Sequence, residues 1–227
     1  IMNCGFRQGL SMQSRKDDVV QSKKRRRISI LVASVVFVLI VLPATYWLYF
    51  FKIRLNFTEV VDQKVYRSGQ PDAERLRDWV RRYNIRTVIN LRGNAGQITR
   101  KEEKVLDEMG VDFLTFKLSA YYLPRKKTLI KLIDSMETIQ TPVLIHCREG
   151  VDRSGTVSAI AAMAIGQERY EKAVWESYVP PGPWKRKAKR NYVHISDLFD
   201  MYEQFVQNRE DTSPGWKKNK KWVVEHY

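Results

Sequence analysis

The longest apolar run in the chain lies at residues 28–51, where ISILVASVVFVLIVLPATYWLYFF contains no charged residue. As a helix that rises about 1.5 Å per residue, this run would be roughly 36 Å long, which is enough to cross the core of a bilayer. Aromatic residues gather at its C-terminal end, where their rings favour the headgroup zone. The pattern predicts one transmembrane helix. A secretory signal cleaved near Ala44 and a buried core helix are the alternatives, although a signal core is usually shorter.

Basic residues flank this apolar run unequally. Residues 23–27 read KKRRR, whereas Lys52 and Arg54 follow on the other side. Because the more basic flank stays in the cytoplasm, we expect a single-pass protein of the cell membrane with residues 1–27 cytoplasmic. Everything after residue 51 would then be extracytoplasmic, in the periplasm if the organism is bacterial. The membrane would separate Cys4 from Cys147 and leave Cys147 a free thiol.

After a linker at residues 52–56, short apolar runs alternate with segments of helical pattern. The expected strands lie at residues 60–66 (as a hairpin), 86–91, 111–118 and 143–146, and the expected helices at 71–83, 99–109, 126–139, from 154 onward, 168–178 and 190–208. Thr99 and Glu102 have the spacing of a capping box. The alternation predicts an α/β fold, a three-layer sandwich with a central, largely parallel sheet of about four to five strands flanked by helices. This domain would span residues 57–208, and a basic tail would occupy residues 209–227.

One loop of this domain has the composition of an anion-binding site. VLIHCREGVDRSG, residues 143–155, places Cys147 directly after an expected strand and Arg153 directly before an expected helix. Ligands bind beyond the carboxyl ends of such strands, and the amides of a glycine-containing loop at a helix N-terminus attract an oxyanion. The same field favours the thiolate of Cys147, and the guanidinium of Arg153 can hold two phosphate oxygens. The pattern indicates phosphoryl transfer through a thiophosphate intermediate.

HCREGVDRSG resembles the H-C-x5-R-[ST] signature of the protein tyrosine phosphatase superfamily, in its dual-specificity-like branch. VYRSGQP (65–71) and VINLRG (88–93) extend the resemblance, over about residues 57–208, to small bacterial phosphatase-like proteins and to atypical dual-specificity phosphatases of plants and fungi. It implies that Cys147 is the nucleophile, that Arg153 binds the phosphoryl group and that Ser154 helps the sulfur to leave. The residues that it implies in substrate binding are Arg148, Glu149, Gly150 and Val151 through their amides, His146 beside the cysteine, and Arg67 and Arg92 at the rim.

The general acid is the point at which the sequence departs from the superfamily. The loop that usually carries it corresponds to LSAYYLP, residues 118–124, which has no carboxylate. Asp112 at the start of a strand and Asp134 on a helix are poorly placed. Myotubularin-type lipid phosphatases resemble this chain in having an aspartate directly before the loop arginine, so Asp152 is the expected acid. The alternative is that Asp152 caps the following helix or pairs with an arginine.

The formal net charge of +15 bears on the substrate and on the partners. Nucleic acid is a poor partner for a domain outside the cytoplasm, whereas basic residues beside a membrane favour anionic headgroups. We expect a phosphorylated lipid, glycolipid, inositol phosphate or phosphotyrosine protein as substrate, and membrane contact through the helix and a basic surface. The basic clusters are Arg81–Arg82, Arg125–Lys127, Lys185–Arg190 and Lys217–Lys221, the last of them between the tryptophans of WKKNKKWVV.

Neither a metal nor a cofactor is expected, because the loop amides and Arg153 would supply the electrostatic stabilisation that metals supply elsewhere. The three histidines, His146, His194 and His226, do not have the spacing of a metal site. A second hypothesis is a catalytically weak phosphatase-fold module that binds anionic headgroups or an envelope partner, which the missing loop acid keeps open. A rhodanese-type sulfurtransferase is disfavoured, because its loop generally has four residues between cysteine and arginine and this one has five.

Overall fold

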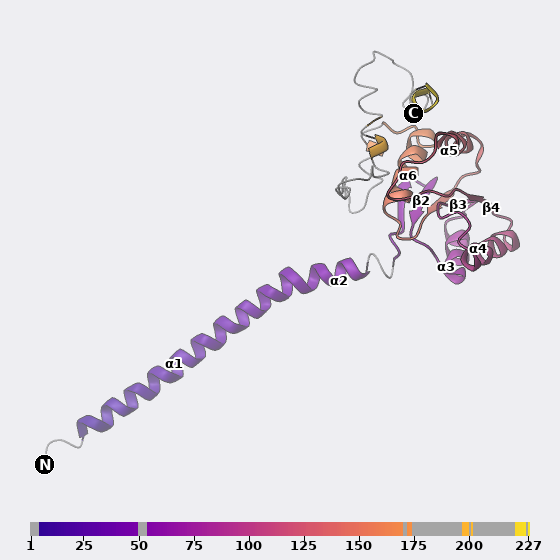
Figure 1. Cartoon of the computed structure of the whole chain (residues 1–227). Helices are drawn as coiled ribbons and strands as arrows, with labels where there is room; N and C mark the ends of the chain where they lie inside the picture. The colour runs from indigo at the N-terminus through magenta and orange to yellow at the C-terminus, as the bar shows by residue number, and fades with distance from the viewer. Residues whose placement is uncertain are drawn as a thin grey trace. The chain divides into compact units, whose positions relative to one another are not determined.

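The computed structural model describes residues 5–49, 54–169, 172–173, 197–199, 201, 221–225 and 227 of the chain (Figure 1). The chain divides into two compact units, Ile1–Ile53 and Arg54–Tyr227. The helices expected at 168–178 and 190–208 lie mostly outside the described residues. The same holds for the basic cluster Lys185–Arg190 and for all of Lys217–Lys221 except Lys221.

The first unit is a long helix interrupted by one π-helical segment. It consists of α1 (Gly5–Val36), the π-helix η1 (Phe37–Val41) and α2 (Leu42–Leu48). The π-helical turn directly precedes the turn that holds Pro43, which has no N–H to donate and whose ring crowds the preceding turn. One helix among the described residues, Gln21–Leu48, is long and apolar enough to cross a membrane, and none of its most apolar stretch is buried. A membrane span and a signal sequence both fit this helix.

The second unit is built on a five-stranded sheet with the order β1-β2-β5-β3-β4. β1 (Thr58–Val61) and β2 (Val65–Ser68) form the expected hairpin, and β2, β5 (Val143–His146), β3 (Thr87–Asn90) and β4 (Asp112–Thr115) run parallel. His146, the last residue of β5, lies opposite Ser68 of β2 and Asn90 of β3. The carboxyl ends of three neighbouring parallel strands, β2, β5 and β3, therefore lie side by side.

Helices cover both faces of this sheet (Figure 1). α3 (Ala73–Arg82) and α4 (Gln97–Glu108) lie on one face, and α5 (Lys126–Thr138) and α6 (Asp152–Ala164) lie on the other. Successive side chains of a strand point to opposite faces, so Leu144 of β5 packs under α3 and α4 while Val143 and Ile145 pack under α5 and α6. Each such side chain stabilises the fold by about 1.5–3 kcal/mol when fully buried. The expected three-layer α/β sandwich is confirmed.

The starts of α3 and α4 differ in how they are capped, and one prediction about them is wrong. Asp72 caps α3, since its Oδ1 accepts a hydrogen bond from the N–H of Arg75 at 2.8 Å. The capping box of Thr99 and Glu102 does not exist, because α4 already begins at Gln97 and its N-cap residue is Gly96. Thr99 Oγ1 instead accepts from the N–H of Ala95 at 2.8 Å and donates to the carbonyl of Gly93 at 3.1 Å. This leaves the carboxyl group of Glu102 available for partners at the edge of the sheet.

Candidate active site

Cys147 lies immediately beyond β5, and its side chain is only 2% exposed. The chain then turns through a loop of residues 147–151 into α6, which begins at Asp152. Cys147 Sγ accepts a hydrogen bond from the N–H of Gly150 at 3.3 Å and lies 3.4 Å from Ser154 Oγ. Both groups can donate to a thiolate, which is the nucleophilic form of cysteine. The strand, the loop and the first turn of the helix thus surround the sulfur with donors.

Gly150 is the residue that makes this loop geometrically possible. Its φ is +75°, in the left-handed region that side chains with a Cβ rarely adopt. A Cβ at this position would lie 2.4 Å from the backbone nitrogen of Gly69 and 2.7 Å from the carbonyl carbon of Ser68. The loop therefore packs directly against the backbone that follows β2, and no other residue type fits at position 150.

The outer side of the loop is held by donors from the segment around β2. Asn56 Nδ2 donates to the carbonyl of Glu149 at 2.5 Å, and the N–H of Gln70 donates to the carbonyl of Arg148 at 3.1 Å. Because the two ends of a trans peptide point in opposite directions, an outward carbonyl of Glu149 directs the N–H of Gly150 inward to the sulfur. A row of inward amides of this kind attracts an oxyanion. Neither Asn56 nor Gln70 was predicted from the sequence to act on the loop.

Arg153 and Asp152 lie in the first turn of α6, and both side chains are partly exposed. Arg153 Nη1 donates to the carbonyl of Leu118 at 3.5 Å, which links the cysteine loop to the neighbouring loop at residues 118–124. Asp152 is the first helical residue, whereas the N-cap position belongs to Val151, which makes no side-chain capping bond. The carboxylate of Asp152 therefore lies where the positive end of the helix favours a negative charge. Asp152 directly precedes Arg153 in the chain, and the loop at residues 118–124 contains no carboxylate.

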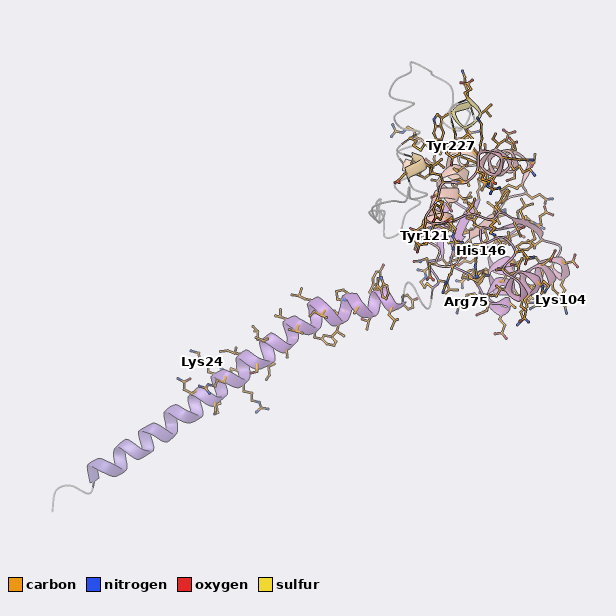
Figure 2. All side chains as sticks on the ribbon, in the orientation of Figure 1. Lys24, Arg75, Lys104, Tyr121, His146 and Tyr227 are labelled. Atoms are coloured by element: carbon orange, nitrogen blue, oxygen red, sulfur yellow. The ribbon has the colours of Figure 1, made fainter. Side chains whose placement is uncertain are left out.

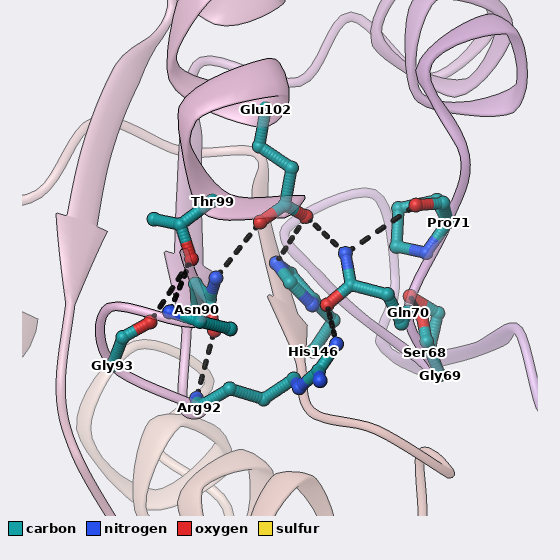
Figure 3. Close-up of polar contacts among 11 residues, drawn as sticks. Ser68, Gly69, Gln70, Pro71, Asn90, Arg92, Gly93, Thr99, Glu102 and His146 are labelled. Atoms are coloured by element: carbon teal, nitrogen blue, oxygen red, sulfur yellow. Dashed lines mark hydrogen bonds and ion pairs between the residues drawn. The ribbon is translucent and has the colours of Figure 1, made fainter. Parts of the chain in front are cut away.

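His146 is fully buried between the strand ends, next to the cysteine in the chain. Its Nε2 lies 3.2 Å from Oε1 of Glu102, a residue of α4 that is 4% exposed (Figure 3). Burial lowers the pKa of His146 to about 4, and the charges of Arg92 and Arg153 act in the same direction. Burial also raises the pKa of Glu102 to about 7, against the hydrogen bonds from Gln70 and Asn90. The imidazole is therefore neutral at pH 7, and the carboxyl group beside it titrates near that pH.

Glu102 is the centre of a buried polar cluster that joins four segments of the domain (Figure 3). Its carboxyl group accepts a short hydrogen bond from Gln70 Nε2 and a second one, of 2.8 Å, from Asn90 Nδ2. Gln70 Oε1 accepts from Arg92 Nη1 at 2.8 Å, and Asn90 Oδ1 accepts from the N–H of Arg92 at 2.7 Å. We name Gln70, Asn90, Arg92, Glu102 and His146 the Glu102 cluster. Through Gln70 it is connected to the carbonyl of Arg148 in the cysteine loop.

The structure changes the expected place of one site residue. Arg67, predicted at the rim of the pocket, is fully buried within β2, so the rim assignment is wrong for this residue. The reason is its strand position, since Arg67 pairs with Ile145 in the middle of the sheet rather than at its end. Arg92 follows β3 and remains partly exposed. The side chains of Arg148 and Glu149 point into solvent, where Nε and Oε1 lie 3.4 Å apart, so only their backbone shapes the loop.

The sequence-based search missed Gln70, Asn90 and Glu102 as parts of the site. Gln70 and Asn90 lie inside the YRSGQP and VINLRG segments, whose resemblance to phosphatases is the sequence signal that could have identified them. The prediction that Asp112 is badly placed is supported by the sheet register, because Asp112 pairs with Thr87 at the opposite end of β3 from Asn90. Three steps along the strand, about 10 Å, separate these two ends.

No curated protein sequence matches this chain. Among solved structures, TpbA from P. aeruginosa is 19% identical with a TM-score of 0.44, over 56% of this chain and 74% of that chain. Tk-PTP in its active form is 20% identical with a TM-score of 0.46, over 67% and 97%. The catalytic core of the PP-IP phosphatase SIW14 from S. cerevisiae is 16% identical with a TM-score of 0.41, over 76% and 85%.

A family model provides the stronger match. Residues 54–180 match the family PTP-NADK, described as a DSP-PTPase phosphatase fused to NAD+ kinase. The matched region begins where the second unit begins and contains β1 to β5, the cysteine loop and α6. Because the match covers more than half of the chain, this protein belongs to the DSP-PTPase phosphatase family, within the protein tyrosine phosphatase superfamily.

Proposed function

We propose that the protein is a cysteine-dependent phosphatase that hydrolyses phosphomonoesters through a phosphocysteine intermediate. The observation that carries this proposal is the double contact on Cys147 Sγ, from the N–H of Gly150 at 3.3 Å and from Ser154 Oγ at 3.4 Å. A sulfur held by donors at a strand end, with an arginine on the next helical turn, is prepared to act as a thiolate nucleophile.

In the first step, Cys147 Sγ attacks phosphorus, and the bond between phosphorus and the leaving oxygen breaks. The loop amides and the guanidinium of Arg153 hold the equatorial phosphoryl oxygens, where charge is stabilised in the transition state. Asp152 donates its proton to the leaving oxygen, because no carboxylate is available in the loop at residues 118–124. In the second step, water attacks the phosphocysteine, Asp152 takes its proton, and Ser154 Oγ donates to the departing sulfur.

The proposed substrates are phosphorylated lipids, glycolipids, inositol phosphates and phosphotyrosine proteins, and the first two follow from membrane anchoring. We propose that residues 28–51 span the membrane once, with residues 1–27 in the cytoplasm and the phosphatase domain outside it. The support is the apolar helix Gln21–Leu48 together with the KKRRR sequence within its N-terminal part. Resistance of the membrane-bound protein to carbonate extraction, and protease access from the outer side, would support this topology. Release by carbonate would refute the anchor.

The first test is release of phosphate from an aryl phosphate by the full chain in detergent, with Cys147→Ser as the control. We expect turnover that falls by roughly 10⁴-fold or more in the variant, because the nucleophile is lost. Equal rates in both proteins would exclude cysteine-based hydrolysis. That result would favour the second hypothesis, a phosphatase-fold module that binds anionic headgroups without turnover.

A further inference from the structure

The loop at residues 118–124, which Arg153 contacts at the Leu118 carbonyl, carries two exposed aromatic side chains. Tyr121 is 65% exposed and Tyr122 is 55% exposed. They are the only aromatic residues among the exposed large hydrophobic side chains described in Arg54–Tyr227. Figure 2 labels Tyr121 on this unit. Exposed tyrosines side by side suggest a surface that contacts something other than water.

Both ends of this loop are fixed, so the tyrosines do not belong to a loose segment. Leu118 is buried in the core, and its carbonyl accepts the hydrogen bond from Arg153. At the other end Leu123 packs against the core, and the carbonyl of Pro124 accepts from the Tyr227 hydroxyl at 2.6 Å. Between these anchors the chain exposes Tyr121 and Tyr122, three and four residues after the carbonyl that Arg153 binds.

The charged residues that follow the tyrosines in the chain are all of one sign. Arg125, Lys126 and Lys127 follow directly, at the start of α5, and all three are exposed. No aspartate or glutamate occurs between Asp112 and Asp134. We name Tyr121, Tyr122, Arg125, Lys126 and Lys127 the tyrosine–lysine patch. Tyrosine rings favour the headgroup zone of a bilayer, and each basic residue near an anionic surface adds electrostatic attraction.

We infer that the tyrosine–lysine patch docks on an anionic phospholipid bilayer and so presents the cysteine loop to phosphomonoesters carried by the membrane. The inference rests on the proposed function and specifies how its substrate is reached. A bilayer is within reach of this unit, because only five residues separate Leu48 of the apolar helix from Arg54. Even fully extended, a link of five residues keeps Arg54 within about 20 Å of Leu48.

The docking arm of the test uses the full chain with Cys4→Ser and Cys147→Ser, so that an added cysteine is the only thiol. Ser119→Cys is labelled with an environment-sensitive dye, and the protein is reconstituted into nanodiscs of phosphatidylcholine with or without 30% phosphatidylserine. We expect a blue shift of the emission in the anionic discs, and the double substitution Lys126→Ala with Lys127→Ala should remove it.

The matched control carries the dye at Glu103→Cys, an exposed position of α4 on the opposite face of the sheet, and its emission should not shift. No shift at position 119, the same shift in neutral discs, or an equal shift at position 103 overturns the inference; absence of any shift would direct attention to a protein partner.

The kinetic arm separates docking from catalysis. In otherwise wild-type protein, Tyr121→Ser with Tyr122→Ser should lower the hydrolysis of a phosphomonoester lipid in anionic discs about tenfold, as expected for the loss of roughly 1.4 kcal/mol of binding. The rate on a soluble aryl phosphate should remain within twofold. Equal losses on both substrates would overturn the docking role. If the wild-type chain hydrolyses neither substrate, the proposed function fails, while the fluorescence arm still decides whether the patch docks.

Discussion

Two loops meet at the carboxyl edge of the sheet, and they are held in opposite ways. The cysteine loop is fixed by buried contacts along its length: Asn56 and Gln70 bind its carbonyls, and the backbone of Gly69 packs against Gly150. The neighbouring loop at 118–124 is held at both ends and exposes Tyr121 and Tyr122 between them. A site that must stabilise a transition state needs fixed donors, whereas a surface that selects substrates needs accessible side chains. We propose on this basis that the cysteine loop serves catalysis and that the loop at 118–124 serves substrate selection.

The largest effect after loss of the nucleophile is expected where the two loops touch. Arg153→Ala removes the guanidinium that would hold the phosphoryl oxygens and also its bond to the carbonyl of Leu118. We expect kcat/KM on an aryl phosphate to fall by roughly 10³-fold, the upper range for one electrostatic donor. Arg86→Ala, an exposed arginine before the opposite end of β3, is the matched control. A similar loss in both variants would show that the effect is general destabilisation.

The rigidity of the cysteine loop is tested by Gly150→Ala. The new Cβ would meet the Gly69 nitrogen at 2.4 Å, so the loop must move away from the backbone after β2. A displacement of about 1 Å can cost roughly 10²-fold in rate. Gly110→Ala is the matched control, because Gly110 also has a positive φ, of +65°, but its Cβ would meet nothing within 4 Å. Both variants should lose some stability in thermal unfolding, and only Gly150→Ala should lose turnover.

The assignment of Asp152, the first residue of α6, as the general acid is tested by Asp152→Asn. We expect a loss of about 10²-fold on an alkyl phosphate, whose leaving oxygen must be protonated, and little loss on a nitrophenyl phosphate. Asp134→Asn on α5 should change neither rate. If Asp152→Asn retains full activity on the alkyl phosphate, the acid comes from elsewhere and Asp152 serves the helix terminus instead.

The smallest effect on the rate is expected for the Glu102 cluster, whose titration changes the stability of the fold instead. The folded-state pKa of Glu102 is raised to about 7 from 4.5, so its stabilising effect is complete below pH 4.5 and is lost as the pH rises to 7. The folded-state pKa of His146 is lowered to about 4 from 6.5, so stability is lost as the pH falls from 6.5 to 4. The two slopes oppose each other between pH 4.5 and 6.5.

Glu102→Gln should therefore reveal the slope of His146 alone. The free energy of unfolding of the variant should rise by about 3 kcal/mol between pH 4 and 6.5. That of the wild type should change little between pH 4.5 and 6.5, where the two slopes oppose each other. Glu103→Gln, the exposed neighbour on α4, should keep the wild-type profile. Identical profiles for Glu102→Gln and the wild type would mean that the two buried groups are not titrating in these ranges.

The sequence could predict what depends on neighbouring residues. The strands and helices of residues 58–164 are where the apolar patterns place them, and Cys147 stands at a strand end because VLIH is a short buried run directly before it. The H-C-x5-R-[ST] spacing identified the loop, and the family match agrees with it. Helix ends were less predictable: Thr99 and Glu102 have the spacing of a capping box, but the helix had already begun at Gln97.

Only the tertiary structure decides which residues far apart in the chain are in contact. Sequence spacing cannot show that β5 lies between β2 and β3, and this strand order brings Gln70, Asn90 and His146 to the same carboxyl group. The same order buries Arg67 in the middle of a strand rather than at the rim. The local pattern sets which segments form strands and where the nucleophile lies, because propensity and periodicity act over a few residues. The support of the loop and the pKa values around it depend on burial, which is a property of the assembled sheet and helices.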